Sequence, residues 1–127
     1  MAENGSKRSA DWVKWGAVWG FIGVAAGTFG AHGLDQVAQA EKAAEWWETA
    51  VLYHLVHALA LVLSGVLQRQ DSSANGPRRA GACFVLGSAI FSGTLYAMAL
   101  GAPRWLGAVT PIGGLLMLAG WALLARR

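Results

Sequence analysis

Four long apolar segments, separated by polar connections, dominate the pattern of the chain. Residues 15–31, 50–67, 80–100 and 106–125 contain no Asp, Glu, Lys or Arg, and each segment is 17 to 21 residues long. An α-helix rises about 1.5 Å per residue, so about 20 residues cross a hydrocarbon core of about 30 Å. The last two segments are apolar on all sides, whereas each helix of a soluble bundle needs a polar face. The pattern predicts an all-α membrane protein, a bundle of four transmembrane helices.

Turn residues and charges place the ends of these predicted helices. We expect a disordered tail over residues 1–10 and a single transmembrane domain over residues 11–127, with helices over residues 11–33, 48–68, 78–100 and 106–125. Asn75-Gly76-Pro77 and Gly101-Ala102-Pro103-Arg104 are typical of turns. Because the second of these turns is tight, the third and fourth helices should form an antiparallel hairpin.

The connection between the first two predicted helices has an amphipathic pattern. Asp35 is expected to cap a short helix that ends at about Trp47. One face of this helix would hold Val37, Ala40, Ala44 and Trp47, and the charged residues Glu41, Lys42, Glu45 and Glu48 would lie elsewhere. A helix of this kind suits the headgroup layer of a membrane, where tryptophan rings act as anchors.

Charges in the connections indicate the orientation in the membrane. Eight of the 10 Lys and Arg residues lie in the N-terminal segment, the middle connection and the C-terminus, namely Lys7, Arg8, Lys14, Arg69, Arg78, Arg79, Arg126 and Arg127. The other two connections hold Lys42 and Arg104. Because cytoplasmic loops carry the excess of Lys and Arg, both termini are predicted to be cytoplasmic. Basic residues at helix ends fit a membrane surface, so the expected partner is the lipid bilayer and not nucleic acid.

Glycines form a stripe on the first predicted helix. Its members are Gly16, Gly20, Gly23, Gly27 and Gly30. Small residues four apart let the backbone of another helix approach closely, and van der Waals packing then holds the two helices together in lipid. We predict helix packing along this stripe, within the chain by default or against a second copy or another membrane-protein subunit.

Polar side chains within the apolar segments gather, by sequence depth, towards the outer half of the membrane. This polar cluster comprises Thr28, His32, Tyr53, His54, His57, Ser92, Tyr96 and Thr110. The first interpretation is hydrogen bonding between helices. Ionisable residues in a membrane also mark proton or solute paths, so the alternative is a transporter or channel that acts as an oligomer through His57 and this cluster.

The histidines also raise the question of a bound group. Haem ligation by His32 with His54 or His57 is one hypothesis, which leaves these three as candidate cofactor-binding residues. A zinc site needs about four ligands, and Cys83 is expected near the inner end of its helix, far from His32. Because no motif supports either site, neither a cofactor nor a metal is predicted.

Catalytic motifs are absent from the sequence. It contains no phosphate-binding loop, no dinucleotide fingerprint, no HExxH and no G-x-S-x-G elbow. The sequence therefore predicts a structural or accessory subunit of a larger membrane complex and not an enzyme.

Several motifs resemble a known family. Residues 27–34 read GTFGAHGL, residues 91–96 read FSGTLY, residues 110–114 read TPIGG, and residues 120–121 read GW. Residues 47–61 have the pattern W-x-T-A-V-x-Y-H-x-x-H-A-L-A-L. In this order they are similar to the family called domain of unknown function 423, whose animal relatives are called transmembrane protein 256; Thr28 and Thr94 replace the usual Ala and Ser. The resemblance implies a small multi-span protein, located in the inner membrane in bacteria, and it implies no established activity.

Overall fold

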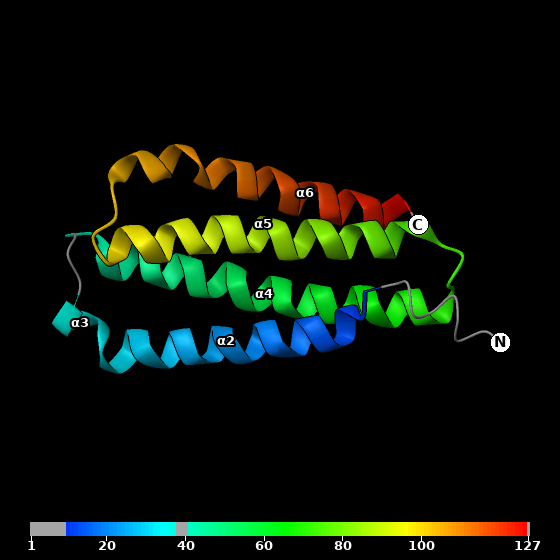
Figure 1. Ribbon diagram of the computed structural model, residues 1–127, viewed down its shortest axis with the longest axis horizontal. Coiled ribbons are helices and arrows are strands. Elements are labelled where there is room, and N and C mark those ends of the chain that lie inside the picture. Colours follow the sequence, from blue (N-terminus) through cyan, green and yellow to red (C-terminus); the bar gives the residue numbers. More distant parts are fainter. Residues whose placement is uncertain (1–9, 38–40, 127) are drawn as a thin grey trace.

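The computed structural model describes residues 10–37 and 41–126 (Figure 1). Within these residues the chain forms helices and no strand: α2 (Trp12–His32), α3 (Leu34–Val37), α4 (Ala43–Gln70), α5 (Asn75–Ala99), the short 3-10 helix η1 (Arg104–Ala108) and α6 (Thr110–Arg126). The all-α prediction is therefore confirmed. Apart from Ala10, the predicted N-terminal tail lies outside the described residues.

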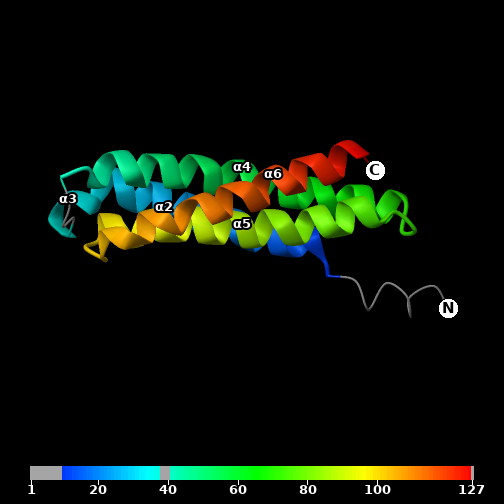
Figure 2. The same cartoon turned by 90° about the horizontal axis from the view of Figure 1, so that it is seen from above.

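The four long helices form an antiparallel row in chain order (Figure 1). α2 packs along α4, α4 along α5, and α5 along α6, so that α2 and α6 are the two edges of the row. The view from above shows the same helices running almost parallel to one another (Figure 2). Because α2 and α6 do not pack extensively on each other in the described residues, a closed four-helix bundle is not confirmed.

Three helical segments are long and apolar enough to cross a membrane. They are Ala43–Gln70, Asn75–Ala99 and Arg104–Arg126. They correspond to the second, third and fourth predicted spans. α2 has 21 residues and is not among these three segments.

The outward faces of the helices are strongly apolar. Phe21 of α2 is 77% exposed, Leu59 of α4 is 72% exposed, and Leu115 and Leu118 of α6 are each 66% exposed. Soluble monomers rarely expose contiguous apolar surfaces of this kind. The pattern fits helices whose outer faces contact lipid.

Local hydrogen bonds and one glycine set the helix ends. The Asp11 carboxylate caps α2, because its Oδ1 accepts from the Lys14 backbone N–H at 3.2 Å. After α5 the chain reverses at Gly101, whose φ of 110° lies in the left-handed region that favours glycine. This reversal makes α5 and α6 antiparallel, as the turn residues predict.

The interfacial helix predicted from Asp35 to Trp47 is not confirmed. α3 ends at Val37, residues 38–40 lie outside the described residues, and α4 already begins at Ala43. Trp47 is 7% exposed, and its indole Nε1 donates to the Ala26 carbonyl oxygen of α2 at 2.8 Å. The second long helix therefore starts earlier than predicted, because its first turns pack against neighbouring helices.

Candidate functional site

The glycine stripe of α2 faces α4. A Cβ atom at Gly16 would lie 2.8 Å from the Val62 backbone nitrogen and 2.9 Å from the Ala58 carbonyl oxygen, too close for any real side chain. A Cβ atom at Gly23 would lie 2.6 Å from the Leu55 side chain, and one at Gly30 would lie 2.6 Å from the ring of Trp47. Gly20 and Gly27 also face α4, at ordinary contact distances. The partner that the sequence leaves open is thus a helix of the same chain.

The close approach of α2 and α4 places His54 at a junction of three helices. This side chain is fully buried. Its Nε2 lies 2.9 Å from the Trp19 carbonyl oxygen of α2, and its Nδ1 lies 2.8 Å from the Tyr96 hydroxyl of α5. Because a carbonyl oxygen only accepts, Nε2 carries the hydrogen and, in the neutral ring, Nδ1 accepts from the Tyr96 hydroxyl. His54 therefore links α2, α4 and α5.

The ring of Trp19 extends this junction. It lies over the His54 imidazole with the ring centroids 3.9 Å apart. Its indole Nε1 donates to Ser88 Oγ on α5 at 2.9 Å, and Ser88 Oγ in turn donates to the Phe84 carbonyl oxygen at 2.6 Å. Trp19 and Ser88 are outside the predicted polar cluster. The indole N–H of a tryptophan within an apolar segment is the signal that could have identified this contact.

His57 lies one turn further along α4 and has different partners. It is 4% exposed, and its Nδ1 lies 2.8 Å from the Tyr53 carbonyl oxygen of its own helix. Trp121 of α6 donates from its indole Nε1 to His57 Nε2 at 3.1 Å. The Phe84 ring of α5 packs against both of them, with its centroid 5.6 Å from that of His57 and 5.0 Å from that of Trp121.

These partners define the protonation state of His57. The indole N–H of Trp121 only donates, so His57 Nε2 must accept and carries no hydrogen. The Tyr53 carbonyl only accepts, so His57 Nδ1 carries the hydrogen. His57 is therefore neutral in this arrangement, and a second proton would break its bond to Trp121. The His54 ring, by contrast, can take a second proton if the Tyr96 hydroxyl turns to accept.

The other members of the predicted cluster are spread along the row of helices. Thr28 is exposed and donates to the Val24 carbonyl oxygen of its own helix, and His32 is exposed at the end of α2. Ser92 donates to the Ala50 carbonyl oxygen of α4 at 2.7 Å. Thr110 lies 2.6 Å, hydroxyl to hydroxyl, from Thr94 of α5. The structure thus spreads these side chains over separate bonds, some within a helix and some between neighbouring helices, and does not gather them in one cluster.

The geometry separates the histidines that were considered for haem. His54 contacts α2 at Trp19, which precedes His32 by 13 residues, or about 20 Å of helix. His32 therefore cannot share a bound group with His54. Among the described residues, no three His, Cys, Asp or Glu side chains come together in a way that could hold a metal ion.

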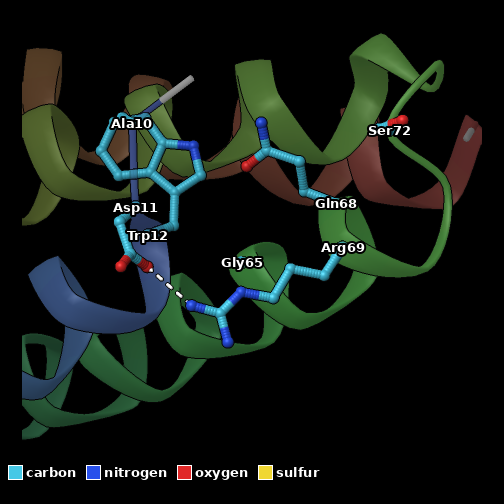
Figure 3. A pocket seen from close by; sticks show the side chains of 7 residues that line it. All are labelled: Ala10, Asp11, Trp12, Gly65, Gln68, Arg69 and Ser72. Carbon is cyan, nitrogen blue, oxygen red and sulfur yellow. Dashed lines mark hydrogen bonds and ion pairs between the residues drawn. The ribbon is translucent and has the colours of Figure 1, made fainter. Parts of the chain in front are cut away.

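One groove lies beside His57, and one pocket lies at the basic end of the row. A groove of about 540 Å³ runs beside His57, with Tyr53, Phe91, Leu118 and Trp121 in its lining. A second pocket, of about 460 Å³, lies at the start of α2 (Figure 3). There Arg69 Nη2 donates to Asp11 Oδ1 at 3.1 Å, and both side chains are largely exposed.

Comparison with known proteins identifies the family. The model of the family described as "Protein of unknown function (DUF423)" matches residues 26–114. The chain belongs to this family. It is 44% identical over 109 residues to a UPF0382 membrane protein of Staphylococcus haemolyticus, covering 86% of this chain and 87% of the relative. It is 38% identical to a UPF0382 membrane protein of Haemophilus influenzae, covering 86% of each chain. No solved structure matches.

The DUF423 match bears on the site in two ways. The matched residues contain all three histidines and Tyr96, but not the hydrogen-bond partners Trp19 and Trp121. Relatives in bacteria and in Schizosaccharomyces pombe are named membrane proteins. The chain is 37% identical to the Schizosaccharomyces pombe protein over 111 residues, which cover 84% of this chain and 91% of the relative. These names agree with the three apolar helices, and this chain is accordingly a small membrane protein.

Proposed function

We propose that this DUF423 protein crosses the bacterial inner membrane four times, with both termini in the cytoplasm. In the row of helices, the start of α2, the end of α4, the start of α5 and the end of α6 share one end (Figure 1). The described basic residues at this end are Lys14, Arg69, Arg78, Arg79 and Arg126. The opposite end holds Lys42 and Arg104 among four described carboxylates, Asp35, Glu41, Glu45 and Glu48. This asymmetry supports the proposed orientation.

α2 is the fourth span in this proposal. It packs along α4 through its glycines, and its other face exposes apolar side chains such as Trp15, Phe21 and Val24. An even number of spans is needed if both termini lie on one side.

Fusions to the C-terminus test this orientation. A green fluorescent protein fused to the C-terminus should fluoresce, and alkaline phosphatase fused there should be inactive. An active phosphatase fusion would refute the orientation.

For its role, we propose a structural or accessory subunit of a larger membrane complex. The observation that carries this proposal is that the buried polar side chains form hydrogen bonds within the chain. Among the described residues, every buried side-chain nitrogen and oxygen has a hydrogen-bond partner within the chain. His54, His57 and Ser92 bond to neighbouring helices or to their own, so their polarity supports a role in packing.

The α6 edge offers a surface for a larger partner. α6 is the least buried of the three apolar spans, with 17% of its most apolar stretch buried against 44% for α4. Tagged protein at native expression level should co-purify in mild detergent with a membrane protein in fixed stoichiometry. Leu118→Trp on the exposed face of α6 should reduce this co-purification, whereas Leu59→Trp on the exposed face of α4 should not. Recovery of the wild type as a solitary monomer would contradict the proposal.

A second candidate is passage of a small solute or proton by an oligomer, and one observation favours it. The open groove of about 540 Å³ between α4, α5 and α6 has His57 and Tyr53 in its lining. The flux of protons or of a small solute into proteoliposomes should then fall in His57→Ala. It should remain unchanged in His32→Ala, which alters an exposed residue at the end of α2. Equal flux in wild type and His57→Ala would remove this candidate.

A further inference from the structure

An open groove of about 470 Å³ lies between α2 and α5, on the part of the row near the basic end. It is lined mainly by Lys14, Val18, Trp19 and Ile22 from α2 and by Val85 and Ala89 from α5. Lys14 is the one charged residue of this lining. The groove is thus apolar along its length and cationic at one end.

The groove exists because α2 packs on α4 and meets α5 mainly through two tryptophans. Trp12 Nε1 donates to the Arg78 carbonyl oxygen at 3.1 Å, and Trp19 Nε1 donates to Ser88 Oγ at 2.9 Å. Elsewhere the backbones of α2 and α5 are not closely packed. Two tryptophan hydrogen bonds therefore bridge the helices, and the apolar groove lies along their surfaces.

Cations gather at the end of the groove without matching carboxylates. Lys14 is exposed, and no carboxylate of the described residues pairs with its ammonium group. The nearest acidic residue in sequence, Asp11, already accepts from the Lys14 backbone N–H and from Arg69. Arg78 is outside the lining, but it precedes Val85 by seven residues and Ala89 by eleven, so the helical repeat places it on the same side of α5. Its Nη2 donates to the neutral Asn75 Oδ1 at 2.9 Å, which leaves the positive charge of the guanidinium without a carboxylate partner in the described residues. The end of the groove is thus suited to an anion.

The length of the groove fits one leaflet of a bilayer. Lys14 and Ile22 are eight residues apart on α2, which corresponds to about 12 Å along the helix. Half of the hydrocarbon core is about 15 Å thick. A lipid whose headgroup lies at Lys14 would therefore place most of its acyl chain along the apolar walls.

We propose that this groove is a binding site for an anionic glycerophospholipid. Its phosphodiester would lie against Lys14 and Arg78, and one acyl chain would lie against Val18, Ile22 and Val85. This inference rests on insertion into a bilayer but not on the accessory role. A zwitterionic lipid offers the same chain without net negative charge, so the site should discriminate by headgroup.

Lipid retention measured by native mass spectrometry tests the site. Purified protein in dodecyl maltoside is mixed with equal amounts of dioleoyl phosphatidylglycerol and dioleoyl phosphatidylcholine. The wild type should retain the anionic lipid preferentially, and Lys14→Gln should lower that preference by about fivefold, the contribution of one cation near a membrane surface. Lys42→Gln, which removes a lysine at the opposite end, is the matched control and should leave the preference unchanged.

A second variant tests the apolar part of the groove with the charges left in place. Ala89 is exposed and lines the groove, so Ala89→Phe should fill it, keep the helical content seen by circular dichroism and lower retention of the anionic lipid. Retained preference in Lys14→Gln, an equal loss in Lys42→Gln, or unchanged retention in Ala89→Phe would each overturn the proposal. The fusion and co-purification experiments on the proposed function do not depend on these variants, so the two can fail separately.

Discussion

His54 and His57 lie one turn apart on α4, but they contribute to different parts of the molecule. His54 is fully buried and bonds to α2 and α5, beside glycines that bring the α2 backbone close. His57 bonds to its own helix and to α6, beside an open groove. The comparison shows that neighbouring residues of one type in one helix can differ in role. The packing of the adjacent helix decides whether the imidazole joins three helices or only supports an edge.

The close approach of α2 to α4 is the basis of the His54 junction, so its loss should have the largest effect. Gly16→Leu places a side chain against backbone atoms of Val62 and Ala58, which cannot move aside. We expect a loss of about 3 kcal/mol in the free energy of unfolding, the upper part of the range for overpacked sites. The measurement is unfolding in mixed micelles, followed by circular dichroism.

Gly93 provides the matched control for this change. A Cβ atom there would meet nothing within 4 Å, so Gly93→Leu should leave stability nearly unchanged or raise it slightly. If both variants lose equal stability, the close approach of α2 and α4 is not what holds this side of the molecule together.

Removal of the His54 side chain should have the next largest effect. His54→Leu loses two interhelical hydrogen bonds and the ring contact with Trp19, and we expect a loss of about 2 to 3 kcal/mol. Tyr96→Phe removes one hydroxyl from the same junction and should cost about 1 kcal/mol. An effect of His54→Leu no greater than that of Tyr96→Phe would mean that the bond to Trp19 contributes nothing.

His57 bonds to only one other helix, the edge helix α6, and this predicts a smaller effect. His57→Leu should remain inserted and folded, with a loss of about 1 kcal/mol, because it loses one bond to another helix. Trp121→Phe removes the donor of that bond. A double-mutant cycle over these two changes should give a coupling free energy of about 0.6 to 1.7 kcal/mol. Loss of the protein from the membrane in His57→Leu would instead make this residue a structural requirement equal to His54.

The smallest effect is expected at the exposed end of the α2–α4 contact. Asp11 and Arg69 form an ion pair whose side chains are 49% and 64% exposed, so solvent screens most of the attraction. Asp11→Asn keeps a capping side chain and should cost less than about 0.5 kcal/mol, whereas Asp11→Ala also loses the cap and should cost about 1 kcal/mol. Equal costs for the two variants would show that charge, and not capping, stabilises the start of α2.

Sequence patterns predicted the individual helices better than their contacts. The apolar segments predicted the α5–α6 hairpin and its turn, and the glycine stripe marked one packed face of α2. The pattern did not place the start of α4, because Glu45 and Glu48 separate apolar residues that still pack when the helix continues. It also missed the α5–α6 contact at Gly87 and Gly113, where a Cβ atom on Gly113 would lie 2.6 Å from the Gly87 carbonyl oxygen.

The partners of the histidines could not be read from the chain. A helix that is apolar on all sides does not reveal which face meets lipid and which meets protein, because the two environments are equally apolar. The pairing of Trp19 with His54 and Ser88, and of Trp121 with His57, depends on how the helices are rotated about their own axes. Steric fit at the glycines and the bonds themselves set that rotation.

The sequence by itself determined the class of this protein and the charge asymmetry of its ends. Both follow from local properties, namely the length of each apolar segment and the position of each charge. The tertiary structure decided the open row, the neutral form of His57 and the cationic groove between α2 and α5. These depend on distances between residues far apart in the chain, which are fixed only when the helices pack.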